Sequence, residues 1–161
     1  MYSIRTIQAQ DNAQMAHIIR QVSKEFGLAA EAGFAVADPI LDQLSVVYDQ
    51  IYAQYWVVEN ELGEILGGGG LAPLKGDESI LEIQKMYFLA EIRNLGFAKQ
   101  ILNLCSEFAK GKGFKSLYLE TTKELWQAVK LYEKLGFLHL DTPQGNTGHS
   151  HACEIWMLKT L

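Results

Sequence analysis

Residues 81–98 read LEIQKMYFLAEIRNLGFA, and they predict a strand, a short turn and the start of a helix. The apolar residues after Asn94 recur with a 3.6-residue period as far as Ala109. The first turn of a helix presents unpaired N–H groups and a positive dipole end, so it binds anions readily. Gly96 and Ala98 would let a pyrophosphate approach the backbone, and Arg93 adds a charge at the rim. Taken alone, the segment fits a tight packing turn between strand and helix equally well.

Strands and helices alternate on both sides of this segment. The patterns predict strands at 3–7, 55–58, 65–71, 81–89, 115–121, 137–140 and 154–158, and helices at 11–25, 39–51, 94–109 and 123–135. Positions 67–70 are all glycine, a density that marks close backbone approach or a bend. The interleaved order predicts one mixed α/β domain over residues 1–161.

Composition limits the class of protein. The 161 residues are 48% apolar and 20% charged, the balance of an ordinary globular domain. A net charge of −5 gives no footprint for nucleic acid or anionic lipid, so neither is an expected partner. The charge suits a cationic substrate only loosely, because solubility alone explains it. With no signal peptide and no apolar run of membrane-spanning length, we expect a cytoplasmic protein.

Three segments together resemble one family. The run Arg93-x-x-Gly96-x-Ala98 after strand 85–88 is similar to the acetyl-CoA signature of the GNAT superfamily of N-acetyltransferases. Residues 118–121, YLET, resemble the fifth strand of that fold, and residues 128–137, AVKLYEKLGF, resemble its helix–strand element. The resemblance implies a central mixed, mostly antiparallel sheet of about seven strands, flanked by four helices and splayed at the cofactor site.

The resemblance also implies how acetyl-CoA would bind. Pantetheine would pair with the strand bearing Met86, Tyr87 and Phe88, which splays from the next strand at a bulge, in the manner of an added strand. The pyrophosphate would sit on the N–H groups of the helix start, at Asn94, Leu95, Gly96, Phe97 and Ala98. The family often has glycine at the positions of Asn94 and Ala98, and often has asparagine where this chain has Leu125. No metal is expected.

Two residues match catalytic positions of the family. Tyr132 lies where a phenol meets the thioester sulfur, so the resemblance assigns it as the general acid; periodicity alone would make it a core residue. Glu82 aligns with a glutamate that serves as a base in some members; the alternative is a solvated or salt-bridged strand carboxylate. Strand alternation places Glu82, Gln84 and Met86 on one face of the sheet.

The acceptor side is less defined. His149 lies in the polar loop between the last two strands, where it could orient the substrate or act as a second base; a turn loop without a chemical role is the alternative. Gln84 is a second candidate for substrate contact. A metal site at His149 and His151 would need a third ligand, and the sequence shows none. Trp56, Trp126 and Trp156 are expected in the core, His17 on the surface and Cys105 on a buried helix stripe.

The sequence thus predicts transfer of an acetyl group from acetyl-CoA to a primary amine of a small molecule or peptide, by direct attack in a ternary complex. A non-catalytic acyl-CoA-binding module stays open, as does an acyltransferase with another acyl donor or a hydroxyl acceptor. A homodimer is an expectation from the resemblance alone. The identity of the amine does not follow from the residues.

Overall fold

The computed structural model describes residues 1–28 and 39–161. Residues 27–38 are rich in alanine and glycine, a composition that predicts a loop, and almost all of them lie outside the described residues. The described residues form seven strands: β1 (Tyr2–Thr6), β2 (Gln54–Asn60), β3 (Ile65–Leu74), β4 (Asp77–Phe88), β5 (Ser116–Thr121), β6 (Leu138–His139) and β7 (Ile155–Thr160). They also form four α-helices: α1 (Asn12–Glu25), α2 (Leu44–Val47), α3 (Phe97–Gly111) and α4 (Trp126–Lys134). The predicted order of elements is confirmed.

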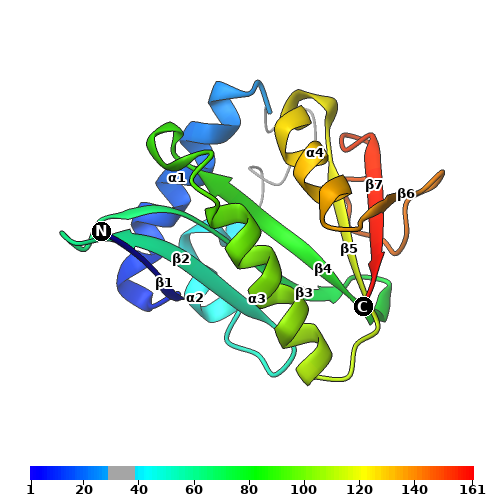
Figure 1. Cartoon of the computed structure of the whole chain (residues 1–161). Helices are drawn as coiled ribbons and strands as arrows, with labels where there is room; N and C mark the ends of the chain where they lie inside the picture. The colour runs from blue at the N-terminus through cyan, green and yellow to red at the C-terminus, as the bar shows by residue number, and fades with distance from the viewer. Residues whose placement is uncertain (29–38) are drawn as a thin grey trace.

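One sheet runs through the molecule in the order β1-β2-β3-β4-β5-β7-β6. All neighbouring strands are antiparallel except β4 and β5, which are parallel. Figure 1 shows helix α3 in front of the sheet and α1 and α2 behind it. One apolar cluster joins α3 and α4 to the sheet, and a second joins α1 and α2 to the opposite face. The fold is therefore the three-layer mixed α/β arrangement that the sequence predicts.

Strands β4 and β5 separate soon after they meet. Within the described chain their ladder consists of Leu81 opposite Leu117 and Glu82 opposite Tyr118. The remainder of β4, as far as Phe88, continues to pair with β3 but not with β5. This divergence is the splay that was expected beside Met86–Phe88. It opens a gap in the sheet directly after Glu82.

A bulge in β4 lies at the start of this divergence. Gly70 pairs with Gln84 and Gly68 pairs with Tyr87, so Lys85 and Met86 share the place of one residue. Lys85 has a φ of 51°, and its carbonyl accepts a hydrogen bond of 2.6 Å from the Tyr55 hydroxyl. A β-bulge inserts one extra residue and re-aims the side chains that follow.

The bulge corrects one prediction. Simple alternation placed Met86 on the same face as Glu82 and Gln84, but Met86 packs into the cluster on the α3–α4 face together with Ile83. Tyr87 instead packs against the α1–α2 cluster. The extra residue reverses the parity of the strand, and a period-2 argument carried through it fails for that reason.

The glycine run of β3 allows close packing on both faces. A β-carbon at Gly70 would lie 2.3 Å from the carbonyl oxygen of Gln54 and 2.6 Å from the Tyr55 ring. On the other face, a β-carbon at Gly67 would lie 2.5 Å from the Phe88 ring. The glycines therefore mark the close approach that their density predicted.

Other boundaries differ from the sequence prediction. Helix α3 begins at Phe97 rather than Asn94, because Asn94 and Gly96 adopt left-handed conformations that no helix can include. The second helix is a 3-10 turn, Pro39–Gln43, followed by the single turn α2. Trp126 is 55% exposed instead of buried, with the Lys130 ammonium 4.9 Å above its ring. Trp56 and Cys105 are buried and His17 is exposed, as expected.

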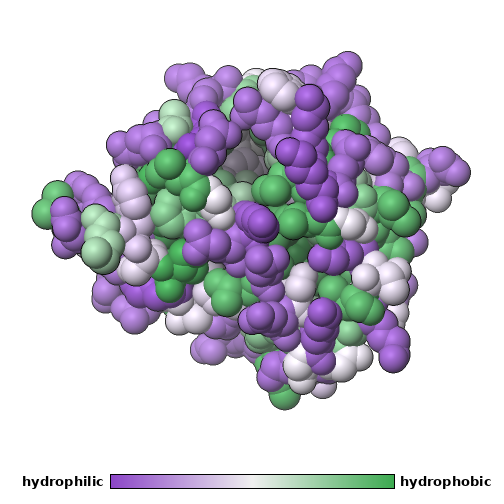
Figure 2. Space-filling model, in the orientation of Figure 1, coloured by the Kyte–Doolittle hydropathy of each residue, from purple (hydrophilic) through white to green (hydrophobic). Residues whose placement is uncertain are grey.

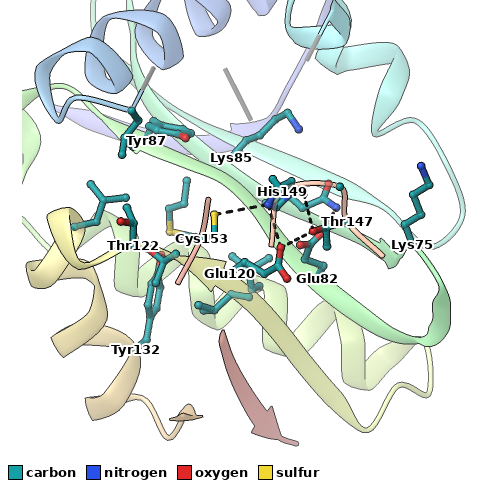
Figure 3. A pocket seen from close by; sticks show the side chains of 18 of the residues that line it. Lys75, Glu82, Lys85, Tyr87, Glu120, Thr122, Tyr132, Thr147, His149 and Cys153 are labelled. Atoms are coloured by element: carbon teal, nitrogen blue, oxygen red, sulfur yellow. Dashed lines mark hydrogen bonds and ion pairs between the residues drawn. The ribbon is translucent and has the colours of Figure 1, made fainter. Parts of the chain in front are cut away.

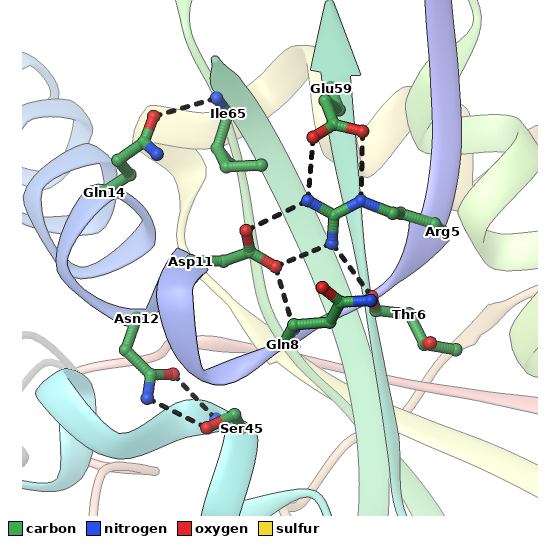
Figure 4. Close-up of polar contacts among 9 residues, drawn as sticks. All are labelled: Arg5, Thr6, Gln8, Asp11, Asn12, Gln14, Ser45, Glu59 and Ile65. Atoms are coloured by element: carbon green, nitrogen blue, oxygen red, sulfur yellow. Dashed lines mark hydrogen bonds and ion pairs between the residues drawn. The ribbon is translucent and has the colours of Figure 1, made fainter. Parts of the chain in front are cut away.

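At the β1–β2 edge of the sheet lies an ion network that the sequence did not indicate (Figure 4). Arg5 on β1 donates two hydrogen bonds to Asp11, at 2.7 and 3.0 Å, and two to Glu59 on β2, at 3.0 and 2.9 Å. Asp11 also accepts the Gln8 N–H at 2.8 Å. The network connects Asp11, the residue before α1, to the first two strands.

Candidate active site

The gap between β4 and β5 is the floor of a cavity of about 460 Å³. Its walls come from β4, β5, α4, the loop between β6 and β7, and Leu28, Pro39 and Ile40 from the segment after α1. Figure 2 shows a hollow in this face of the molecule, between α1 and α4. Of the residues proposed from the sequence, six line the cavity: Glu82, Gln84, Met86, Tyr87, Tyr132 and His149. The splay thus brings both catalytic candidates and both substrate candidates to one space.

Glu82 is held in this cavity by a chain of polar groups. Its side chain lies on β4 and the residue is 4% exposed. The Gln84 amide donates to Glu82 Oε1 at 2.6 Å, and the Tyr48 hydroxyl donates to Gln84 Oε1 at 2.7 Å. Burial raises the pKa of Glu82 above its usual value, and the Gln84 hydrogen bond and the nearby His149 partly oppose that rise. A buried carboxylate with a raised pKa is better suited to accept a proton than an exposed one.

Tyr132 reaches the cavity from α4. The residue is 7% exposed, and its ring packs edge-on against Phe137 with centroids 5.8 Å apart. Burial raises the pKa of the Tyr132 phenol, so the hydroxyl keeps its proton at neutral pH. In Figure 3, Tyr132 lies on the side of the cavity away from Glu82, with Cys153 between them. The space between the two side chains is where a thioester and an amine could meet.

A second carboxylate, Glu120 on β5, was not proposed from the sequence. Its side chain is fully buried, and both of its oxygens accept hydrogen bonds. Oε1 accepts from the Thr147 hydroxyl at 2.5 Å and pairs with His149 Nδ1 at 3.0 Å. Oε2 accepts from the Tyr118 hydroxyl at 2.6 Å and the Ser150 hydroxyl at 2.5 Å. A carboxylate within an apolar strand was the only sequence signal, and three of its four donors lie about 30 residues away in the chain.

This carboxylate sets the charges in the cavity. Burial alone would raise the pKa of Glu120, but its four hydrogen bonds lower it, so it is ionised at neutral pH. Burial alone would lower the pKa of His149, but contacts with Cys153 and Glu120 raise it to about 10. Nδ1 of His149 lies 3.7 Å from the Cys153 sulfur. His149 is therefore an imidazolium at neutral pH.

Glu82, Glu120 and His149 each bring one possible metal-ligand atom within 4.8 Å of the others. The two oxygens of Glu120 already accept four hydrogen bonds, which uses the lone pairs that an ion would need. His151 is exposed and does not belong to this group. In the described structure, Glu120 and His149 pair with each other and Glu82 accepts from Gln84.

The expected cofactor segment lies beside the cavity. Gly96 is the N-cap of α3 with a φ of 89°, Asn94 has a φ of 65°, and no described side chain caps the helix start. Asparagine is among the few residues that tolerate this backbone region, which explains its place where the family often has glycine. Neither Phe88 nor residues 93–98 line the cavity itself.

Arg93 is already engaged. Its guanidinium donates two hydrogen bonds to Glu25, at 2.6 and 2.8 Å, and Nε donates to the Phe88 carbonyl at 2.9 Å. The same group lies 5.1 Å above the Phe26 ring. In this structure Arg93 joins the turn after β4 to the end of α1, instead of offering an open charge at the rim as the sequence suggested.

Known proteins agree with this fold. Residues 21–137 match the model of the acetyltransferase (GNAT) family. The chain is 54% identical over 159 residues to the uncharacterized N-acetyltransferase YjgM of Escherichia coli, covering 98% of this chain and 94% of that protein. This chain belongs to the GNAT acetyltransferase family. It spans less than half the length of some vertebrate N-acetyltransferases that it also matches.

Solved structures show the same fold at low identity. A GNAT-family acetyltransferase from Staphylococcus aureus matches with a TM-score of 0.85 and 20% identity, covering 100% of this chain and 99% of that one. The PaiA N-acetyltransferase of Thermoplasma acidophilum, in complex with coenzyme A, matches with a TM-score of 0.77 and 18% identity, with 100% and 99% covered. Among the described residues no helix is both long and apolar enough to cross a membrane. The chain is an acetyltransferase of a family that uses acetyl-CoA.

Proposed function

We propose that this protein transfers an acetyl group from acetyl-CoA to a primary amine of a small molecule or peptide, by direct attack within a ternary complex. The observation that carries the proposal is the single cavity at the β4–β5 gap, with Glu82 on one wall and Tyr132 on another. We further propose that residues 1–161 act as one catalytic domain, since the walls of the cavity come from this one sheet, its helices and the loops that connect them.

The cofactor would lie along the splayed strand. Residues 86–88 of β4 have no β5 partner in the described ladder, so pantetheine can add beside them as a further strand would. The pyrophosphate would then reach the uncapped first turn of α3, at Gly96, Phe97 and Ala98, after the turn Asn94–Leu95. Arg93 would keep its ion pair with Glu25, and its contribution would be to position the backbone of this turn.

The chemistry follows from the two catalytic candidates. Glu82 would take a proton from the incoming ammonium, which frees the nitrogen lone pair to attack the thioester carbonyl. The C–N bond forms, the nitrogen loses its second proton to solvent, and the tetrahedral intermediate collapses with cleavage of the C–S bond. Tyr132 would give its hydroxyl proton to the departing sulfur and regain one from solvent. Gln84 and His149 face the acceptor side of the same cavity and would contact the amine-bearing substrate.

The test is binding of acetyl-CoA, followed by thiol release with a panel of primary amines: single amino acids, a polyamine, and dipeptides with free N-termini. We expect acetyl-CoA to bind and one amine class to release thiol. Tyr132→Phe should lower kcat by about 10²-fold or more while the dissociation constant for acetyl-CoA stays the same.

The matched control is Tyr52→Phe, because Tyr52 is a half-exposed tyrosine that packs on Phe114 and does not line the cavity. It should behave like the unaltered protein. Absence of acetyl-CoA binding would contradict the cofactor assignment. Binding with no turnover for any amine or alcohol would favour a non-catalytic acyl-CoA-binding module, and full activity of Tyr132→Phe would remove the assigned acid.

A further inference from the structure

Glu120 accepts hydrogen bonds from four side chains, and three of these four side chains come from the same loop. Thr147, His149 and Ser150 lie in the connection between β6 and β7, and Tyr118 is two residues away on β5 itself. The Tyr118 hydroxyl in turn accepts the backbone N–H of Gln144 at 3.0 Å. One carboxylate thus determines where residues 144–150 lie against the sheet.

The loop has few other attachments of this strength. The Asn146 N–H donates to the Lys75 carbonyl at 2.5 Å, and His149 N–H donates to the Thr147 hydroxyl at 3.3 Å. Neither contact sets the direction of the His149 imidazole. That direction is set through Nδ1, which pairs with Glu120 Oε1 at 3.0 Å and lies 3.7 Å from the Cys153 sulfur, so both contacts use the same nitrogen of the ring.

The imidazole so held faces the acceptor side. His149, Thr147 and Gly148 line the cavity together with Glu82, and Figure 3 shows His149, Glu120 and Glu82 gathered on one side of it. The charged and titratable groups that act on Glu82 are Lys85 from β4, Glu120 and Tyr118 from β5, and His149 from the loop. His149 is the cation on the loop, and its charge favours the ionised form of Glu82.

We propose that Glu120 is a positioning residue for acetyl transfer, which fixes the 144–150 loop and directs the His149 imidazole toward Glu82 and the acceptor amine. The inference rests on the proposed function, because it assumes that Glu82 and the acceptor meet in this cavity. Glu120 also lines the cavity, but both of its oxygens are engaged by the four donors. The effect of Glu120 on the reaction passes through His149. Loss of the carboxylate removes the hydrogen bonds that hold the loop and orient the imidazole.

The variant Glu120→Gln tests the inference, since glutamine keeps the size of the side chain but cannot accept four donors. With the fastest amine of the panel, we expect kcat/KM for the amine to fall by at least about tenfold, because small misplacement of reacting groups is costly. The acidic limb of the pH profile should move to higher pH, because the loss of the directed His149 cation, which lowers the pKa of Glu82, outweighs the loss of the Glu120 charge, which raises it. Binding of acetyl-CoA should not change.

Two further variants separate positioning from stability. His149→Gln should show the same shift of the acidic limb, and the double variant should lose no more activity than the stronger single variant, because both act through one imidazole. Glu59→Gln is the control: Glu59 is also an ion-paired strand carboxylate, but it lies in the Arg5 network away from the cavity. It should lower Tm without moving the pH profile. If Glu120→Gln does not fold, Ser150→Ala and Thr147→Val remove one donor each and should give smaller shifts in the same direction.

A measurement without turnover distinguishes this inference from the proposed function. In protein carrying ¹⁵N-labelled histidine, His149 should titrate near pH 10 in the unaltered chain and at a lower pH in Glu120→Gln, which removes one of the contacts that raise its pKa. The inference is overturned if His149 titrates alike in both, or if Glu120→Gln lowers Tm while kcat/KM and the pH profile stay unchanged. Normal His149 behaviour with no amine turned over would instead count against the proposed function.

Discussion

Asp11 and Glu120 are both buried carboxylates with several donors, yet their partners differ in kind. Asp11 accepts from the Arg5 guanidinium and from a backbone N–H, next to fully paired strands. Glu120 accepts from three hydroxyls and an imidazole, next to the gap where β4 and β5 part. Arginine keeps its charge at every accessible pH, whereas histidine changes its charge within the accessible pH range.

The difference teaches what each network can do. A guanidinium pair with fixed charge gives a rigid joint between β1, β2 and the start of α1, and nothing in the cavity depends on it. A network of hydroxyls and one imidazole on a cavity wall can hold a loop and also respond to the charge of a substrate. We therefore expect changes in the Arg5 network to lower stability and changes in the Glu120 network to lower activity.

The largest expected effect on stability is that of Asp11→Asn. This change leaves the Arg5 guanidinium with one carboxylate instead of two, and breaking a buried pair costs about 3 kcal/mol of unfolding free energy, or roughly 6–12 °C in Tm. Thermal and urea unfolding measure the loss. Activity at 25 °C should stay at the level of the unaltered protein, and a fall in kcat with little change in Tm would erase the distinction between the two clusters.

The pH dependence of stability should differ between the clusters. The folded pKa of His149 is raised from its usual 6.5 to about 10, so its contribution is fully present below pH 6.5 and is lost as the pH rises through about 10. The Tm difference between the unaltered protein and His149→Gln should therefore shrink over that range. Hydrogen exchange at residues 144–153 should rise in parallel.

Asp11 provides the contrast. Burial alone would raise its pKa, but Arg5 and the Gln8 N–H lower it, so its contribution is present above its unfolded pKa and is lost only as the pH falls through the depressed folded value. The Tm difference caused by Asp11→Asn should stay constant between pH 6.5 and 10. A difference that shrank in alkali for both variants would contradict the assignment of the effect to His149.

The smallest effect is expected for Arg20→Gln. Arg20 and Asp42 form a two-bond ion pair at 2.9 and 2.7 Å, but their side chains are 47% and 59% exposed. Exposed pairs contribute between about 0 and 1 kcal/mol, so Tm should move by no more than roughly 2–4 °C. Urea unfolding at low and high salt measures the contribution of this pair to stability. A loss as large as that of Asp11→Asn would show that burial does not determine how much an ion pair stabilises this fold.

Much of the fold could be predicted because its signals are local. The order of the elements, the seven strands and the splay beside Met86–Phe88 follow from periodicity and a resemblance carried by short segments. Glu82 and Tyr132 were placed by position within those segments, and both line the cavity. The face of Met86 was predicted wrongly, because one bulged residue at Lys85 reverses the alternation and no local pattern announces it.

The sequence by itself determined the class of protein, the order of its elements and two candidate catalytic side chains, since apolar period and motif spacing act over a few residues. The tertiary structure decided the rest. It brought the 144–150 loop to Glu120, paired Arg93 with Glu25 and aimed His149 into the cavity. These contacts join residues 27 to 68 positions apart, and only the packing of helices and loop on the sheet brings such residues together.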